Sequence, residues 1–217
     1  MATARIRRRK FWGWGYDDQQ PPHEQVVAAG DAARAHLGFE PDEVERAPVL
    51  EDVELPPARL EPPGSLAEIC ATDPHERAVH AYGRSYRDVV RAFRGRFDHA
   101  PDFVARPRDE DDVRRILEWC SEAGAAAIPY GGGTSVVGGV EAAVGEGYAA
   151  AVALDLGRLD RVLEVDATSR AARIQAGAPG PALEDGLRGH GLSMRFYPQS
   201  FEFSTLGGWI ATRAGGH

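Results

Sequence analysis

The sequence predicts an α+β fold, and two observations support that prediction. From about residue 98 onward, short apolar runs typical of strands are interspersed with amphipathic helical segments. Before that point, prolines and glycines divide the chain into helices joined by extended stretches. The chain has 217 residues, of which 43% are hydrophobic and 27% are charged, so it can form a packed core.

Residues 1–97 are expected to form an N-terminal segment of helices and extended chain. Residues 24–38 predict a helix that Gly38 closes. Five prolines then make residues 47–64 an extended connector, because proline disfavours both helix interiors and central strands. A group of aromatic residues near the start is expected to pack onto the domain; the alternative is an exposed interaction patch. The group comprises Phe11, Trp12, Trp14 and Tyr16.

A longer helix is predicted over residues 72–95. Thr72 or Asp73 can cap its first turn, and Pro74 suits the first helical position. Gly95 is expected to end it. Its apolar face would consist of Tyr82, Tyr86, Val89, Val90 and Phe93.

Residues 98–217 are expected to form the second part, an α+β domain. Strands are predicted at 102–107, 125–129, 148–156, 161–166 and 170–177. Between the first two strands, residues 109–124 predict an amphipathic helix with an acidic first turn and a closing glycine. Its apolar stripe would be Val113, Ile116, Leu117 and Cys120. A second helix is predicted over residues 180–191, and a further helix is expected to begin near Gly207 and Gly208.

Composition excludes several classes of function. The formal net charge of −8 argues against nucleic acid as a partner, since phosphate binding needs a clustered basic face. The basic run over residues 5–10 is expected to be solvated; a contact with an anionic surface is the alternative. No run of eighteen apolar residues exists, so no transmembrane segment is expected. Two cysteines and no apolar leader favour a reducing cytoplasm. The histidines lack metal-ligand spacing, so no metal is expected.

The stretch "IPYGGGTSVVGG", residues 128–139, indicates a phosphate-binding loop. Glycines allow close approach to the backbone, and successive free amides form a nest for anions. A Walker loop needs a lysine after its last glycine, but Lys10 is the only lysine in the chain. A Rossmann fingerprint needs a third spaced glycine and a following helix, and both are missing. From the loop alone, an anion nest and a flexible turn between strands both remain open.

Four blocks in fixed order carry a family resemblance: "IPYGGGTSVVGG", "ALDLGRLDRVLEVD", "RIQAGAPGPALEDGLRGHGL" and "PQSFEFSTLGGWIATRAGG". Together they resemble the FAD-binding domain of the vanillyl-alcohol oxidase, or PCMH, type of flavoprotein. Within that superfamily the sequence is most similar to the alkyldihydroxyacetonephosphate synthase-like FAD-linked oxidases. The segments "FWGWG" and "DEDDVRRILEWC" also resemble that subgroup, so the resemblance covers roughly residues 10–217.

The resemblance implies a PCMH-type FAD-binding domain of two small α/β subdomains, with FAD held by three segments. The first would hold the pyrophosphate through its backbone amides, the second would run beside the flavin, and the third would complete that wall. Related synthases tend to have an acidic residue at the position of Gln199 and an aliphatic residue at that of Phe201. These differences leave the phosphate role intact and affect only the contacts beside the flavin. Arg213 is open between a surface role and pairing with the cofactor. The implied residues are Pro129, Tyr130, Gly131, Gly132, Gly133, Thr134 and Ser135; Pro198, Gln199, Ser200, Phe201, Glu202, Phe203 and Ser204; and Ala211, Thr212, Arg213 and Ala214.

The resemblance also implies a function for the whole family. Its members oxidise or rearrange a substrate at the flavin; in the synthase-like branch, a fatty alcohol replaces the acyl chain of an acyl-glycerone phosphate. Family proteins are longer, and their substrate domain supplies the catalytic groups, so this chain is expected to be truncated and its catalytic residues are unknown. The expected partners are FAD, a small-molecule or lipid-like substrate and a second copy in a homodimer. The alternative is a catalytically inactive FAD-binding or interaction module.

Overall fold

The computed structural model describes residues 7–38 and 43–216. Arg5 and Ile6 of the basic run, and the terminal His217, lie outside the described residues. The α-helices are α1 (His23–Leu37), α2 (Pro74–Val79), α3 (Tyr86–Phe93), α4 (Glu110–Ala123), α5 (Gly180–Arg188) and α6 (Leu206–Thr212). The strands are β1 (Cys70–Ala71), β2 (Phe103–Ala105), β3 (Ala125–Tyr130), β4 (Ala150–Asp155), β5 (Val162–Asp166) and β6 (Ala171–Ile174). Short 3₁₀ turns lie at Asp17–Gln19, Leu50–Asp52, Ala67–Ile69 and Leu156–Arg158.

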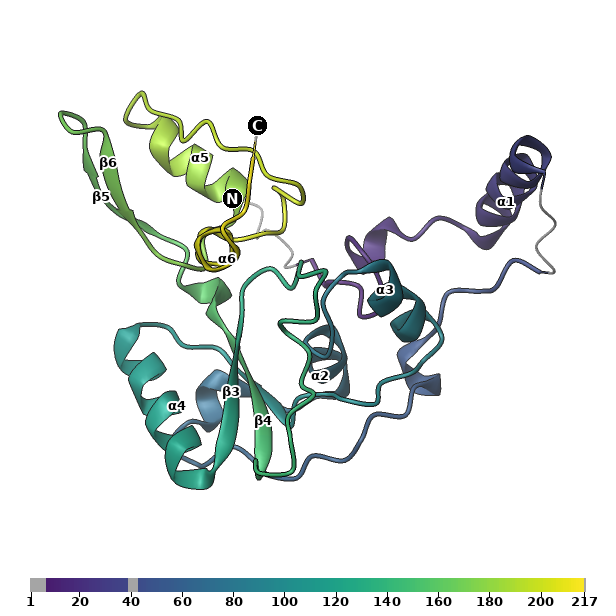
Figure 1. Cartoon of the computed structure of the whole chain (residues 1–217), viewed down its shortest axis with the longest axis horizontal. Coiled ribbons are helices and arrows are strands. Elements are labelled where there is room, and N and C mark those ends of the chain that lie inside the picture. The colour runs from purple at the N-terminus through teal and green to yellow at the C-terminus, as the bar shows by residue number, and fades with distance from the viewer. Residues whose placement is uncertain (1–6, 39–42, 217) are drawn as a thin grey trace, which may run out of the picture.

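A four-stranded sheet forms the centre of the larger part, in the order β1-β2-β4-β3. Strands β2, β4 and β3 are parallel, whereas the short β1 runs antiparallel to β2. Helix α4 packs against β3, and α2 packs against β2 (Figure 1). The core between α4 and the sheet contains Ile116, Cys120, Phe103 and Val152, all nearly or fully buried. The α+β class predicted from the sequence is confirmed.

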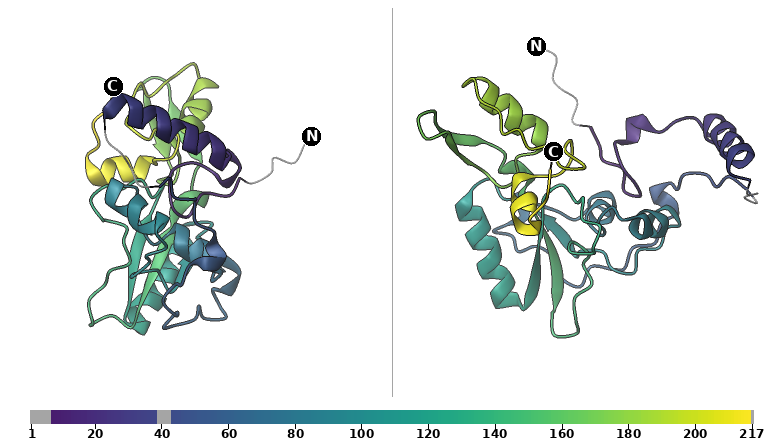
Figure 2. Two further views of the ribbon diagram at one scale, coloured as in Figure 1. Left: turned by 90° about the vertical axis from the view of Figure 1, so that its right-hand side faces the viewer. Right: turned by 45° about the horizontal axis from the view of Figure 1, so that its top comes forward.

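A second, smaller part follows the sheet. Strands β5 and β6 form an antiparallel hairpin, and α5 packs against β5. Leu183, Leu187 and Trp209 form its buried core, so α5 and α6 share one apolar cluster. Figure 1 and Figure 2 show this part above the sheet, on the side of the carboxyl ends of β3 and β4. The arrangement agrees with two small subdomains.

The single helix predicted over residues 72–95 is wrong, because the structure has two helices there. Asp73 caps α2 and Ser85 caps α3, each side chain accepting a hydrogen bond from a backbone amide. The break contains Gly83, where a Cβ atom would lie 2.1 Å from the carbonyl oxygen of Ser135. Close contact with a distant loop therefore interrupts the helix, and it leaves Tyr86 86% exposed instead of on an apolar face.

Both predicted ends of helix α4 are confirmed, but its predicted apolar stripe is only partly buried. Asp109 caps it by accepting a hydrogen bond from the amide of Asp112, and Gly124 ends it in the left-handed conformation. Ile116 and Cys120 are buried as expected, but Leu117 is 46% exposed. Trp119 packs against the core instead, so the helix is rotated from the expected face.

The N-terminal residues form a packed arm, residues 7–22, and a separate helix, α1. The aromatic group packs onto the domain as expected: Phe11 lies against Phe97, and Trp12 meets the ring of Phe93 edge-on. Helix α1 has no buried residue and stands away from the rest (Figure 1). The boundary expected at residues 97/98 stays a prediction, and β1 from the first part pairs with β2 of the second. No helix in the described ranges has the length and apolarity needed to cross a bilayer.

Candidate functional site

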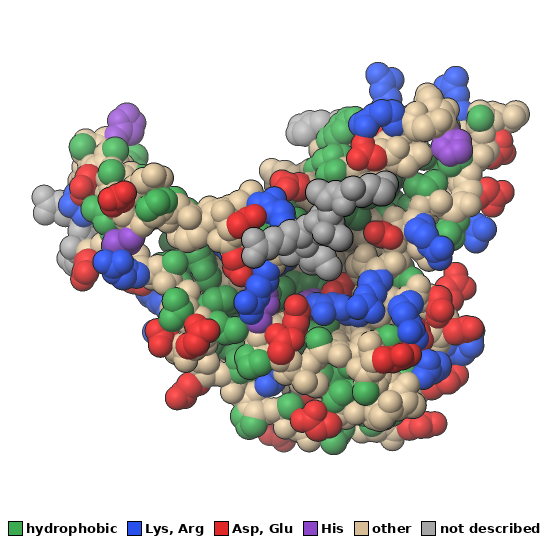
Figure 3. All heavy atoms as spheres, turned by 180° about the vertical axis from the view of Figure 1, so that it is seen from behind, with side chains coloured by type: hydrophobic (Ala, Val, Ile, Leu, Met, Phe, Trp, Pro, Cys, Tyr) green, Lys and Arg blue, Asp and Glu red, His purple; other side chains and the backbone are tan. Residues whose placement is uncertain are grey.

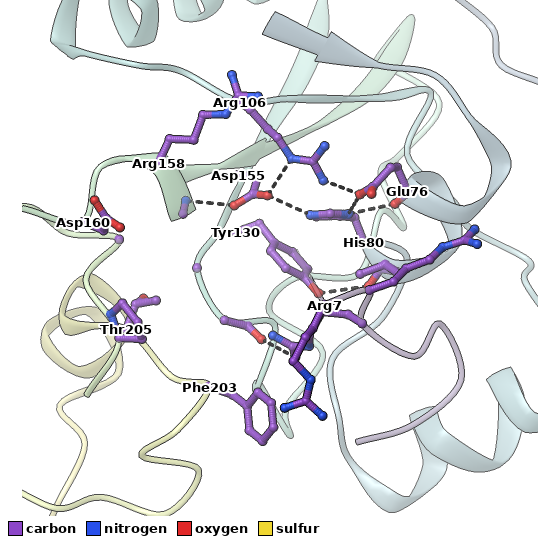
Figure 4. Close-up of a pocket in the computed structure, with 18 of the residues that line it drawn as sticks. Arg7, Glu76, His80, Arg106, Tyr130, Asp155, Arg158, Asp160, Phe203 and Thr205 are labelled. Atoms are coloured by element: carbon purple, nitrogen blue, oxygen red, sulfur yellow. Dashed lines mark hydrogen bonds and ion pairs between the residues drawn. The ribbon is translucent and has the colours of Figure 1, made fainter. Parts of the chain in front are cut away.

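A cavity of about 760 Å³ lies where the carboxyl ends of β3 and β4 face the smaller part (Figure 4). Ligands of open α/β sheets bind at such strand ends, and ligand pockets typically measure ~300–1,000 Å³. The walls come from the N-terminal arm, α2, the two strand ends and the segments that begin α5 and α6. The residues that line it are Arg7, Arg8, Arg9, Tyr16, Asp73, His75, Glu76, Val79, His80, Arg106, Tyr130, Gly131, Gly132, Asp155, Gly157, Arg158, Asp160, Gly177, Pro179, Glu202, Phe203 and Thr205.

The glycine loop begins at the end of β3, and it packs directly against the segment 203–205. A Cβ atom on Gly132 would lie 1.8 Å from the carbonyl oxygen of Phe203, so only glycine allows this approach. Tyr130 anchors the strand end: its hydroxyl group is buried and donates to the carbonyl oxygen of Val79 at 2.9 Å. The contact between Gly132 and Phe203 joins two segments that are about seventy residues apart in the sequence, and both were predicted to hold FAD.

The backbone amides of the glycine loop are free to bind an anion. Across the part of the chain that the structure describes, no group accepts a hydrogen bond from the amide nitrogens of Gly132, Gly133, Thr134 or Ser135. Successive unpaired amides are the defining feature of an anion-binding nest. The loop therefore has the donor set that a phosphate group requires.

Ser135 fixes the far end of the loop. Its carbonyl oxygen accepts a hydrogen bond from the amide of Arg84 at 2.7 Å, in the break between α2 and α3. Its hydroxyl oxygen accepts weaker bonds from the amides of Val137 and Gly139, at 3.4 and 3.3 Å. The loop is therefore held at both ends, and its free amides keep a defined direction.

Four ionisable side chains form a network beside Tyr130, where the loop begins (Figure 4). Arg106 donates to the carboxylates of Glu76 and Asp155, with 3.1 Å to the latter. His80 lies 3.2 Å from Asp155 through Nε2 and 2.7 Å from the backbone carbonyl of Glu76 through Nδ1. Because both partners are acceptors, the two bonds form together only when the imidazole ring carries both protons.

The network holds both carboxyl groups in the ionised form. Burial alone would raise the pKa of Asp155, but its hydrogen bonds and charged neighbours, His80 first, lower that pKa to about 2. His75, 3.9 Å away, and the charge of Arg106 lower the pKa of Glu76 to about 2. Arg106 is therefore neutralised by its carboxylate partners, and the network is a structural brace for this wall.

The sequence did not point to this network. Its members come from α2, the end of β2 and the end of β4, so no local spacing connects them. The one available signal was Asp155, which directly follows a continuous apolar strand at the edge where ligands bind. Metal-type histidine spacing does not reveal the contact of His80 with Asp155. The described residues contain no cluster suited to a metal ion.

Only some of the predicted cofactor residues line the cavity. Those that line it are Tyr130, Gly131, Gly132, Glu202 and Phe203. The remaining residues of these two segments are not among those that line the cavity: Pro129, which lies in β3, Gly133, Thr134, Ser135 and the remainder of 198–204. Residues 211–214 lie at the end of α6, where Ala211, Thr212 and Arg213 are exposed and Ala214 packs on the smaller core. Arg213 has no ion pair within the described residues.

Arginine side chains gather between the two parts of the molecule, in the hollow seen from behind (Figure 3). Arg7, Arg8 and Arg9 come from the N-terminal arm, while Arg106 and Arg158 come from the ends of β2 and β4. Five carboxylates line the same cavity, namely Asp73, Glu76, Asp155, Asp160 and Glu202, so its lining has no formal net charge when histidines are counted as neutral. The approach of the arm's arginines to the cavity was not predicted, because the sequence favoured a solvated basic tail.

Comparison with known proteins agrees with the geometry. The family model described as "FAD binding domain" matches residues 101–217. Alkyldihydroxyacetonephosphate synthase of Dictyostelium discoideum is 40% identical over 141 residues, which cover 65% of this chain and 23% of that protein. The same enzyme of Trypanosoma brucei brucei is 38% identical over 144 residues, covering 66% and 24%. D-2-hydroxyglutarate dehydrogenase of Xanthomonas citri pv. viticola is 35% identical over 119 residues, covering 54% and 24%.

A solved structure of alkyldihydroxyacetonephosphate synthase superposes with a TM-score of 0.81 at 30% identity. The match covers 96% of this chain and 44% of the solved one. The chain therefore spans about a quarter of the length of the synthases it matches and less than half of the solved structure. The similarity extends into the N-terminal arm and connector, well beyond the residues that the family model matches.

Proposed function

The chain belongs to the family of FAD-binding domains, and from this premise we propose that it forms the FAD-binding portion of an alkyldihydroxyacetonephosphate synthase-like flavoenzyme. The cofactor of this family is FAD. Four successive unpaired amides, at Gly132 to Ser135, carry the proposal. They would donate to the diphosphate of FAD from the carboxyl end of β3.

The residues present fit an anionic dinucleotide. Arg9 donates to the carbonyl oxygen of Gly132, and the loop is braced at Tyr130 and Ser135. When bound, FAD supplies the redox chemistry of its flavin ring. The role of this chain would be to bind the cofactor, orient it and shield one side of it from water.

The other two predicted segments would line the rest of the cofactor. Residues 198–204 run beside the glycine loop, and Ser200 adopts a positive φ of 61° that turns the chain there. Residues 211–214 end α6, where their exposure leaves them available for contact. We assign both segments to the flavin side, as the family resemblance implies; the packing of Phe203 and Ser204 on Gly132 supports this for the first of them.

Activity of the whole protein extends beyond these residues. The relatives are named as a synthase and as dehydrogenases, and this chain covers only about a quarter of each. We propose a small-molecule or lipid-like substrate and a homodimer for the assembled enzyme. A cytoplasmic location is supported by two free thiols, Cys70 and Cys120, and subcellular fractionation tests it. No separate observation favours a module without turnover.

Reconstitution with FAD tests the proposal. The purified 217-residue chain should take up one FAD per chain and quench the flavin fluorescence. Substitution Gly132→Ala should abolish uptake, because the new methyl group forces the loop away from Phe203. Gly139→Ala is the matched control, since its Cβ atom would meet nothing closer than 3.6 Å. A chain that is folded, as judged by circular dichroism, and binds no FAD would refute the proposal.

A further inference from the structure

The N-terminal arm presents three consecutive arginines to the cavity, and one of them differs from the other two. Arg7 forms an ion pair with Asp18 at 2.7 Å, and Arg8 lies 3.8 Å from Asp17. Arg9 has no carboxylate partner within the described residues. Its guanidinium group is therefore not paired with a carboxylate there, although the charge of Asp155 acts on it from beyond ion-pair distance.

Arg9 is nevertheless the most enclosed of the three. One terminal nitrogen donates to the carbonyl oxygen of Gly132 at 3.2 Å, and the guanidinium carbon lies 4.7 Å over the ring of Phe203. Its Nε atom is buried and finds no acceptor among the described groups. Burial lowers the pKa of Arg9, and the nearby charge of Arg84 lowers it further. A half-buried cation beside another cation is costly unless an anion joins them.

Arg84 repeats the same pattern at the back of the loop. It is only 4% exposed, and its guanidinium group donates to the carbonyl oxygens of Tyr82, Gly83 and Lys10. Its Nε atom is also buried without an acceptor in the described part of the chain, and no carboxylate pairs with it there. Two arginines near the glycine loop, the half-buried Arg9 and the buried Arg84, thus have carbonyl oxygens as partners, to which Arg9 adds the ring of Phe203.

Arg9 and Arg84 differ from the other arginines of the cavity. Arg158 also lacks an ion pair within the described residues, but it is exposed. Arg106 is neutralised by Glu76 and Asp155, as described above. The arm itself is held in place: the carbonyl oxygen of Arg9 lies 3.0 Å from Nε2 of His75, and Arg9 forms a β-bridge with Tyr16. Arg9 is therefore positioned by the fold at the edge of the loop and is not a mobile surface residue.

We propose that Arg9 is a ligand of the FAD diphosphate, and that the N-terminal arm is thereby a fourth cofactor-binding segment. The proposal rests on the proposed function of the glycine loop. Guanidinium groups form strong charge-assisted hydrogen bonds with phosphate oxygens, and four unpaired amides lie in the loop that Arg9 contacts. A diphosphate would supply the anion that Arg9 and Arg84 lack.

Binding measurements on two matched variants test the inference. Arg9→Gln removes the unpaired charge, and Arg94→Gln removes an arginine outside the cavity that already has a carboxylate partner, Glu45. The dissociation constants of FAD and riboflavin are measured by flavin fluorescence, and that of inorganic pyrophosphate by calorimetry. We expect Arg9→Gln to weaken FAD and pyrophosphate about tenfold or more, since hydrogen bonds to charged groups are among the stronger ones. The affinity for riboflavin, which has no phosphate, should change less than about twofold, as should the affinity of Arg94→Gln for every ligand.

The outcomes separate this inference from the proposed function. If the wild-type chain binds FAD and Arg9→Gln binds it equally well, the inference is wrong while the glycine loop keeps its role. If the wild-type chain binds pyrophosphate but not FAD, the proposed function fails, and weakening of pyrophosphate by Arg9→Gln still supports an anion site at Arg9. If it binds neither, both fail. Arg9→Lys, which keeps the charge, should restore at least part of the affinity if the Arg9→Gln effect is electrostatic; a variant as weak as Arg9→Gln would count against the proposal.

Discussion

Substitution Asp155→Asn should destabilise the folded chain near neutral pH. Asp155 ends β4 beneath the cavity, where its carboxylate is 16% exposed and contacts His80 and Arg106. Asparagine keeps the shape and the acceptor for the amide of Gly157, which now donates at 2.9 Å. The substitution therefore removes the charge while the local backbone turn is preserved.

The magnitude follows from the shift in pKa. The folded chain lowers the pKa of Asp155 from 3.8 to about 2, and each pH unit corresponds to ~1.4 kcal/mol, so the charge contributes about 2 kcal/mol at pH 7. A lowered folded pKa gives stability that is present above the unfolded value and is lost as the pH falls through the folded one. The difference between wild type and variant should therefore be constant above about pH 5 and shrink toward pH 2.

Urea unfolding monitored by circular dichroism measures the effect at pH 7, 4 and 3. Asp160→Asn is the matched control, because Asp160 lines the same cavity but is exposed and has no ion pair within the described ranges. It should change the free energy of unfolding by less than about 0.5 kcal/mol. Equal stability of Asp155→Asn and wild type at pH 7, or a difference that persists unchanged at pH 3, would refute the reasoning.

Three further predictions concern the loop and the buried groups. Gly132→Ala should lower the free energy of unfolding by about 2–3 kcal/mol in urea titrations, while Gly139→Ala stays within about 0.5 kcal/mol; equal effects would contradict the close approach of the loop. Tyr130→Phe should cost about 1 kcal/mol, because it leaves a backbone carbonyl of α2 unpaired, and thermal unfolding would show no change if that bond were unimportant. Burial raises the pKa of Cys70 to about 11 and also raises that of Cys120, so Ellman's reagent at pH 7.5 should modify both thiols at least about a hundredfold faster after unfolding in urea. Rapid modification of the folded chain would contradict that burial.

The sequence predicted the elements whose ends carry local signals. Gly38 and Gly124 end α1 and α4 as expected, and Asp73 with Pro74 begins α2. These signals act within one helical turn, so they can be read without knowledge of the fold. The helix expected across Gly83 failed, because the reason for its break is a contact with Ser135, which lies fifty-two residues away.

The candidate site was predicted in part for the same reason. The glycine loop is a contiguous stretch, so its anion-binding character follows from its own residues. The packing of Gly132 on Phe203, the Asp155 network and the approach of Arg9 all join distant segments, and periodicity contains no information on them. A phosphate loop without charged side chains was expected; the structure adds arginines from the N-terminal arm and the break after α2.

The most direct test is an NMR titration of the ¹⁵N-labelled chain with FAD and, separately, with riboflavin. The central claim is that the amides of Gly132, Gly133, Thr134 and Ser135 donate to the diphosphate, so their resonances should shift with FAD and stay in place with riboflavin. Movement of those four resonances with FAD alone would support the account. FAD binding that leaves them unchanged while resonances elsewhere shift would contradict it.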